Sequence, residues 1–455
     1  MKKFYFFILL VSFLFNIANG QELKRIGILG IATAPVNDSI LSSLGVEKTN
    51  GVIVTAVRPN TTASEIKILE NDVITKIINS DVKTYKNITD VFLMLREGDK
   101  ISFTVIRNKE TISLTGKVIP KPKETYENSE VIYDKVKFQN GYLRTIITKP
   151  KTGEKHPAIF FIPGYTCYSL DNLGSHPYGQ LFKSLVDKGY VLMRVEKPGM
   201  GDCEGTPDCF EIDLNTEVEA FEKGYEKMLE YDFVDKDNII VFGHSLGGIE
   251  GPMVAEKFNP RGIVVYGTGV NTWYEYLLEM FRFQNPLMGI SYLENEKHIQ
   301  SMIPLLYDYL IQKKTPAELS ANSDYKKLME SDMEYDGKTH LWSRDYKYWQ
   351  QIQDLNLTEY WAKIKSNVLV IWGECDFEAF SRFDHESIIE IVNQNNPGKG
   401  TFYVLPNTDH AFAKVESVKK DAELMKSGTY SKYMRENFNT NLTDKIDEWI
   451  NSILK

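Results

Sequence analysis

The stretch IIVFGHSLGG, residues 239–248, decides how the rest of the chain is organised. An apolar strand runs straight into Gly-x-Ser-x-Gly, and a helical pattern follows it. So tight a turn leaves no room for side chains two residues before or after the serine, which explains Gly243 and Gly247. We expect Ser245 to project above the strand end as a nucleophile, with the Leu246 amide directed at a developing oxyanion. The alternative is an ordinary glycine-rich turn, which the preceding strand disfavours.

Two further residues complete a candidate triad in chain order. A serine needs a base to take its proton, and the base needs a carboxylate to hold its tautomer. Asp376 ends the segment GECD after one apolar strand, and His410 ends LPNTDH after the next. We expect Ser245, Asp376 and His410 to be catalytic. The alternative acids, which we interpret as surface groups, are Glu374, Glu378 and Asp384.

Strand and helix patterns alternate from residue 156 to residue 266 and resume at 367. Such alternation predicts a parallel sheet flanked by helices. With the ordered serine, acid and histidine, the region from about residue 130 onwards resembles the α/β-hydrolase superfamily. The resemblance implies an α/β-hydrolase domain over residues 131–455. The helical, aromatic-rich stretch 272–365 is expected to form a cap over the site, with rings that both pack the cap and line a pocket.

The second oxyanion donor is expected in the segment Pro163-Gly164-Tyr165-Thr166, where the superfamily commonly has His-Gly. The amide of Tyr165, or that of Thr166, is the predicted donor. Further candidates for substrate binding are Gly164, Thr166, His244 and His176. For His244, which lies next to the serine, local packing is the alternative.

The run EKPGMGDCEG, residues 196–205, resembles a glycine-rich loop of the serine aminopeptidase-like and dipeptidase-like branches of the superfamily. Cys203 stands where those proteins have serine. The resemblance implies that this loop shapes a wall of the site.

The N-terminal region, residues 21–120, resembles a PDZ domain of the bacterial type, as in periplasmic high-temperature-requirement proteases. The matching pieces are Leu29-Gly30-Ile31 and the run ENDVI, in which Asn71 replaces the usual glycine and tolerates left-handed geometry. The resemblance implies a β-rich domain whose Leu29, Gly30 and Ile31 amides cradle a peptide's terminal carboxylate. A spacer with an empty groove is the alternative, and the insert 36–50 is a candidate cover for the groove.

A charged, Pro-bearing segment marks the domain boundary, and we place a linker at residues 121–130. Asn140-Gly141 between two alternating runs predicts a β-hairpin.

Residues 1–20 read as a signal peptide: two lysines, an apolar run of a dozen residues, then Ala18-Asn19-Gly20 before Gln21. A membrane anchor is the alternative, but the run is shorter than the roughly 20 residues that a span needs. No later segment is long and apolar enough to span. We expect an exported protein, periplasmic or secreted.

Four cysteines occur in the chain, and an oxidising compartment permits disulfides. Cys203–Cys209 is the first pairing to expect, with four free thiols as the alternative. No Cys/His spacing predicts a metal site, and the predicted chemistry needs no cofactor. The net charge of −9 without a basic stripe argues against nucleic acid as a partner.

These features predict an exported serine hydrolase that cleaves a small-molecule carboxylic ester or an amide through an acyl-enzyme. A serine peptidase to which the PDZ domain delivers peptides is the first alternative. A catalytically inert peptide-binding protein is an alternative of another class.

Overall fold

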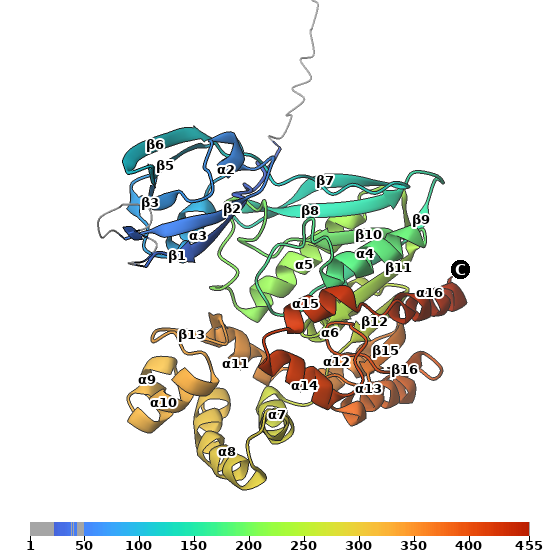
Figure 1. Ribbon diagram of the computed structural model, residues 1–455. Coiled ribbons are helices and arrows are strands. Elements are labelled where there is room, and N and C mark those ends of the chain that lie inside the picture. Colours follow the sequence, from blue (N-terminus) through green and yellow to red (C-terminus); the bar gives the residue numbers. More distant parts are fainter. Residues whose placement is uncertain (1–21, 38, 40, 43–49, 455) are drawn as a thin grey trace, which may run out of the picture.

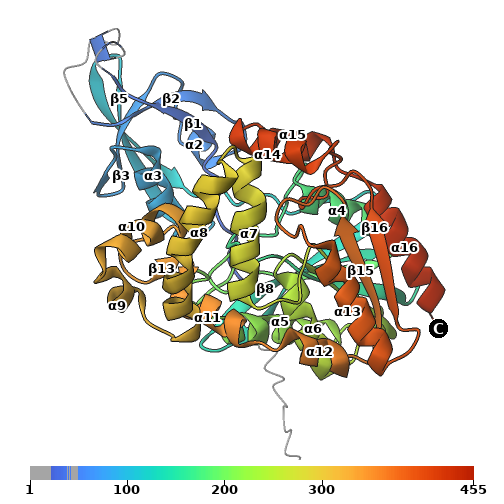
Figure 2. The same cartoon turned by 90° about the horizontal axis from the view of Figure 1, so that it is seen from below.

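The computed structural model describes residues 22–37, 39, 41–42 and 50–454. The expected signal peptide and most of the insert 36–50 lie outside the described residues. The described part comprises a small antiparallel sheet, a large mostly parallel sheet and a helical cap (Figure 1). In both views the small sheet and the cap lie away from the end occupied by β15, β16 and α16 (Figures 1 and 2).

The small sheet is the PDZ part, with strand order β1-β2-β3-β5-β6 and β4 beside β3. Its elements are β1 (Ile31–Pro35), β2 (Val52–Val57), α2 (Thr62–Glu65), β3 (Val73–Ile77), β4 (Ser80–Asp81), α3 (Tyr85–Phe92), β5 (Lys100–Arg107) and β6 (Glu110–Lys117). Their inward apolar side chains form one core. α3 begins at Tyr85 because Thr84 and Asn87 form a capping box there. Asn71 has the left-handed conformation expected of it, with φ of 72°.

The large sheet has the strand order β16-β15-β12-β11-β9-β10-β8-β7, and the α/β-hydrolase architecture is confirmed. Its strands are β7 (Ser129–Phe138), β8 (Gly141–Pro150), β9 (His156–Ile162), β10 (Val191–Val195), β11 (Val234–His244), β12 (Gly262–Tyr266), β15 (Asn367–Gly373) and β16 (Gly400–Leu405). The strands from β16 to β10 run parallel to one another, and β8 runs antiparallel to both of its neighbours, β10 and β7. β11, which leads to Ser245, therefore lies at the centre.

Helices cover both faces of this sheet because its strands are apolar on both faces. In β9, Ile159 and Phe161 pack toward α4 (Pro177–Asp187) and α16 (Asn441–Ile453). The alternate residues, Ala158 and Phe160, pack toward the other face, which bears α5, α6, α12 and α13. These helices span Leu214–Met228, Gly247–Phe258, Leu357–Lys363 and Arg382–Asn395. The period-2 alternation of a strand thus distributes one apolar run between two cores.

The expected hairpin forms, but its turn lies one residue earlier than Asn140-Gly141. Phe138 pairs with Gly141, so Gln139 and Asn140 make the turn, and Gln139 has a φ of 46°. Gly141 is needed for another reason: a Cβ there would lie 2.1 Å from the Glu204 carbonyl oxygen. The loop after β10 crosses the hairpin at that point.

The cap lies between β12 and β15, as expected, and is mostly helical (Figure 2). α7 (Trp273–Leu287) and α8 (Tyr292–Leu306) lie side by side, followed by a π-helical turn (Tyr307–Ile311), α9 (Pro316–Ser320), α10 (Ser323–Asp332), β13 (His340–Leu341), β14 (Arg344–Asp345) and α11 (Tyr346–Asp354). Its buried rings, such as Trp349, continue the core of the sheet. After β16 come α14 (Val418–Lys426) and α15 (Tyr430–Glu436). No helix among the described residues has the length and apolarity needed to cross a membrane.

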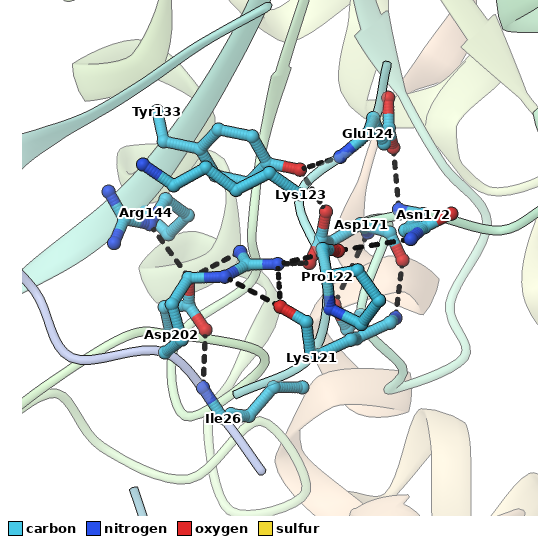
Figure 3. A network of polar contacts seen from close by, with 12 residues as sticks. Ile26, Lys121, Pro122, Lys123, Glu124, Tyr133, Arg144, Asp171, Asn172 and Asp202 are labelled. Carbon is cyan, nitrogen blue, oxygen red and sulfur yellow. Dashed lines mark hydrogen bonds and ion pairs between the residues drawn. The ribbon is translucent and has the colours of Figure 1, made fainter. Parts of the chain in front are cut away.

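The segment expected to be a linker is bound to the hydrolase part instead of lying free. β7 already begins at Ser129, and the Glu124 carboxylate makes a buried ion pair with Arg194, 2.8 Å apart. Figure 3 shows this segment among polar side chains of the hydrolase part, with Ile26 of the PDZ part nearby. A charged segment forms an exposed linker only when its side chains have no buried partners of opposite charge.

The expected Cys203–Cys209 disulfide is wrong, and so is the alternative of four free thiols. Cys209 pairs with Cys167, from the loop after β9. Cys203 and Cys375 are free and buried. The Cys203 side chain turns inward, where its sulfur accepts a hydrogen bond from the Arg144 amide at 3.3 Å, so closeness in sequence did not decide the pairing.

Candidate active site

Ser245 lies in the tight turn that the sequence predicts between β11 and α6. Its φ of 57° is left-handed, and its amide donates to the Tyr266 carbonyl at 2.9 Å. A Cβ on Gly243 would lie 2.0 Å from the Gly247 carbonyl oxygen, and one on Gly247 would lie 2.2 Å from that of Ile162. Both glycines are therefore required by close backbone approach, as expected.

Asp376 and His410 come together although 34 residues separate them. The loops after β15 and β16 carry them, and Nδ1 of His410 lies 2.9 Å from Oδ2 and 3.1 Å from Oδ1 of Asp376. The amides of Glu378 and Ala379 donate to Asp376 Oδ1 at 2.9 and 2.7 Å. Burial opposes ionisation of Asp376, but the facing imidazole and these amides keep its pKa below the ordinary value.

The other ring nitrogen of His410 faces the carboxylate of Glu378, a residue that the sequence suggests is a surface group. Nε2 lies 3.3 Å from Oε2 of Glu378, whose side chain is 47% exposed. Burial lowers the pKa of His410, but the carboxylates of Asp376 and Glu378 outweigh it and raise this pKa to about 10. In the sequence, the one sign of this contact is that Glu378 lies two residues after Asp376.

Ser245 and His410 both line a cavity of about 100 Å³ beneath the cap. Aromatic side chains line much of its wall: Tyr165, Trp273, Tyr276 and Phe380. Two acids, Glu378 and Asp384, also line it. Burial and nearby Glu279 raise the pKa of Asp384 to about 6 despite a hydrogen bond from Ser381. The cavity therefore combines apolar walls with acidic groups beside the nucleophile.

Gly164 and Tyr165 lie where the sequence places the second oxyanion donor. A Cβ on Gly164 would lie 3.0 Å from the Ser245 Cβ, so this backbone reaches the nucleophile directly. In the part of the chain that the structure describes, the amides of Tyr165, Thr166 and Leu246 donate to no protein acceptor. Free backbone donors at this point meet the requirement for an oxyanion site.

None of the four residues expected to bind substrate, Gly164, Thr166, His176 and His244, lines the cavity. His244 is buried behind it, bonded through Nδ1 to the Tyr178 hydroxyl and through Nε2 to the His410 carbonyl at 2.9 Å, so its alternative packing role holds. His176 caps α4, where its Nδ1 accepts from the Tyr178 amide at 3.2 Å. Thr166 is exposed outside the cavity.

A second cavity lies on the PDZ part, between β1 and α3. The residues expected to cradle a carboxylate, Leu29, Gly30 and Ile31, line it together with Arg58 and Lys121. β1 is an edge strand, and among the described contacts the Leu29 and Gly30 amides have no acceptor. This is the geometry that an added peptide strand requires.

Within the described ranges, no group of three or more His, Cys, Asp and Glu side chains is arranged to hold a metal ion.

Comparison with known families gives two matches. Residues 27–118 match the PDZ domain, and residues 142–385 match the X-Pro dipeptidyl-peptidase family S15, which covers more than half of the 455 residues. The second match includes Ser245 and Asp376 and ends before His410. A search of curated proteins found no significant match.

The solved structures similar to this chain include an esterase-named protein, a peptidase, an α/β hydrolase and a protein described as hypothetical, all of low sequence identity. Est1E of Butyrivibrio proteoclasticus, with ferulic acid bound, is 17% identical, with 67% of this chain and 98% of that chain covered and a TM-score of 0.41. Acylaminoacyl peptidase of Pyrococcus horikoshii is 15% identical, with 79% and 57% covered and a TM-score of 0.42. A hypothetical protein of Pseudomonas aeruginosa is 12% identical, with 68% and 95% covered and a TM-score of 0.42.

Proposed function

The chain belongs to the X-Pro dipeptidyl-peptidase (S15) family, and on this premise we propose that it cleaves a carboxylic ester or amide through an acyl-enzyme formed on Ser245. One observation carries the proposal. His410, 2.9 Å from Asp376, lines the same cavity as a serine held in a tight strand-to-helix turn.

The residues have defined roles in this reaction. Oγ of Ser245 attacks the carbonyl carbon while Nε2 of His410 takes the hydroxyl proton, which it then gives to the leaving group. Asp376 holds the imidazole by Nδ1 and stabilises its charge. The Leu246 and Tyr165 amides receive the oxyanion. Water then attacks the acyl-enzyme by the same proton route and releases the acid and Ser245.

Hydrolysis of a short p-nitrophenyl ester tests this assignment. We expect Ser245→Ala to lose about 10⁴-fold or more in kcat, because the nucleophile itself is gone. Ser184→Ala in α4, whose hydroxyl bonds Thr443 at 2.8 Å far from the cavity, should keep wild-type activity. Wild-type turnover by Ser245→Ala would refute the assignment. Failure of a fluorophosphonate probe to label Ser245 in the folded protein would favour the inert peptide-binding alternative.

A peptide substrate with a free amino end is the second candidate, and the acidic wall of the cavity favours it. Glu378 and Asp384 lie among aromatic rings, where a substrate ammonium group would find both charge and apolar cover. Comparing acyl esters with aminoacyl and prolyl amides, each with a free and an acetylated amine, separates the two. Faster cleavage of the free amines would select the peptidase, and indifference to acetylation would select the esterase.

The PDZ part is proposed to bind peptide C-termini in the groove between β1 and α3. A fluorescent peptide with a free carboxylate should bind, and its amidated twin should not.

We further propose that the protein is exported after removal of residues 1–20. N-terminal sequencing of the mature protein should begin at Gln21.

A further inference from the structure

Two buried cationic side chains bind carbonyl oxygens of the loop that carries Gly164 and Tyr165. Nζ of Lys197 donates to the Gly164 carbonyl oxygen at 2.6 Å, and Nη1 of Arg344 donates to the Tyr165 carbonyl oxygen at 2.6 Å. Both cationic side chains are only 1% exposed. Consecutive carbonyls of one short loop are thus fixed by charged donors.

Holding a carbonyl also orients the amide of the same peptide plane. In a trans peptide the N–H points away from the C=O, so these bonds direct the Tyr165 and Thr166 N–H groups to the opposite side of the loop. A cation on the carbonyl oxygen also polarises the peptide group and makes its N–H a stronger donor. The Tyr165 amide is the one that the proposed reaction uses.

A single carboxylate joins the two cations. Oε1 of Glu217, on α5, lies 2.6 Å from Lys197 Nζ, and Oε2 lies 2.5 Å from Arg344 Nη2. Burial opposes it, but these cations keep the Glu217 pKa low, so the group stays an anion. Glu250 packs beside it, and burial together with the Glu217 charge raises its pKa well above the ordinary value, so Glu250 stays neutral. The two cations thus face one shared carboxylate behind the oxyanion site.

The two cations come from different parts of the chain. Lys197 follows β10 in the sheet, whereas Arg344 belongs to β14 in the cap. Among the residues that the structure describes, Arg344 alone connects the cap to this loop by a charged hydrogen bond, so the cap contributes to the oxyanion site as well as to the cavity wall.

We propose that Lys197 and Arg344 are positioning residues of the second oxyanion donor: Lys197 aims and polarises the Tyr165 amide through the peptide plane that they share, and Arg344 fixes the next peptide plane, so that the cap helps to hold this donor in place. This inference rests on the proposed function of Ser245. It assigns a role in the transition state, where the negative charge develops, and none in ground-state binding.

The rate at which a fluorophosphonate labels Ser245 tests the inference without knowledge of the substrate. We expect Arg344→Met, which leaves Glu217 paired with Lys197, to slow labelling and kcat about 10- to 100-fold with little change in KM, since losing an oxyanion donor outright costs about 100-fold or more. Affinity for phenylboronic acid, whose tetrahedral adduct places an oxygen at the same site, should fall by a similar factor. Arg344→Lys keeps a cation and should recover most of the loss.

Two further variants keep the result clear. Lys197→Met removes the other cation, leaves Glu217 paired with Arg344, and should give the same pattern, so either variant suffices if one fails to fold. Arg194→Met/Glu124→Gln, a matched buried ion pair outside the site, should keep wild-type labelling. Labelling and boronate affinity within twofold of wild type in folded Arg344→Met would overturn the inference alone. Wild-type protein that does not label would overturn the proposed function, and the inference with it.

Discussion

The Glu378 carboxylate, 3.3 Å from Nε2 of His410, sets the protonation of the proposed base. With Asp376 on the other side, the imidazole lies between two anions, and its pKa rises to about 10. Proton abstraction from Ser245 needs Nε2 unprotonated, so activity should increase as pH rises through this pKa. A substrate ammonium group that pairs with Glu378 would neutralise this carboxylate. The imidazolium would then lose one of its two stabilising anions, and the pKa of His410 would fall.

Glu378→Gln should therefore move the rising limb of the kcat/KM profile for an ester substrate to lower pH and increase activity at neutral pH. The sign follows from removing an anion that stabilises the imidazolium. Glu374→Gln, on the same loop but bonded to the Asn407 amide at 3.0 Å, should leave the limb unmoved. A limb that stays in place in Glu378→Gln would show that this carboxylate does not control the base. Because Glu378 is half exposed, added salt should shift the wild-type limb in the same direction.

Most residues of this site could be predicted from the sequence by their type and their position. Gly243 and Gly247 follow from the space around a strand-to-helix turn, and Asp376 and His410 follow from their places after apolar strands. Glu378 did not, because its side chain reaches His410 only through the bend of the loop after β15. The packing role of His244 also depends on Tyr178, from a distant helix.

At the level of elements, the disulfide joins two loops that border the site. Cys167 lies in the loop after β9, two residues beyond Tyr165, and Cys209 lies in the loop between β10 and α5. The crosslink closes a loop of 42 residues, which in the chain-entropy account corresponds to about 4 kcal/mol of stability.

Cys167→Ser/Cys209→Ser should lower the free energy of unfolding by about 2–4 kcal/mol in urea denaturation and reduce kcat more than it changes KM. The second effect follows because the crosslink holds the loop that carries the Tyr165 amide. Cys203→Ala, which removes a free thiol from the same region, serves as the control and should keep kcat. Equal stability of the double variant and wild type would contradict the structural role of the crosslink.

At the level of the whole molecule, Arg25 ties the PDZ part to the hydrolase part. Its guanidinium lies 2.7 Å from Asp171 and 2.8 Å from Asp202, and it also donates to the Lys121 carbonyl oxygen at 2.9 Å. The next residue, Ile26, donates its amide to Asp202 at 2.7 Å (Figure 3). Since Ile26 leads directly into residues 29–31 of the PDZ part, the two parts share a buried polar joint.

Arg25→Met should cost about 3–5 kcal/mol, because Asp171 and Asp202 lose the charge that compensates their burial. We expect trypsin to cleave faster after Lys123, where the joint loosens. Lys24→Met breaks only the exposed pair with Asp99 at 3.2 Å and should change neither property measurably. Unchanged stability and cleavage in Arg25→Met would mean that the joint contributes nothing.

The sequence by itself determined the features that depend on neighbouring residues: the alternation of strands and helices, the glycines around Ser245, and the order of the proposed triad. Their physical basis is local, since periodicity and turn sterics act within a few residues. Only the tertiary structure decided the Cys167–Cys209 pairing, the carboxylate at His410 and the Lys197–Glu217–Arg344 cluster. Each joins residues from separate elements, and a buried charge finds its partner only once the whole chain has packed around it.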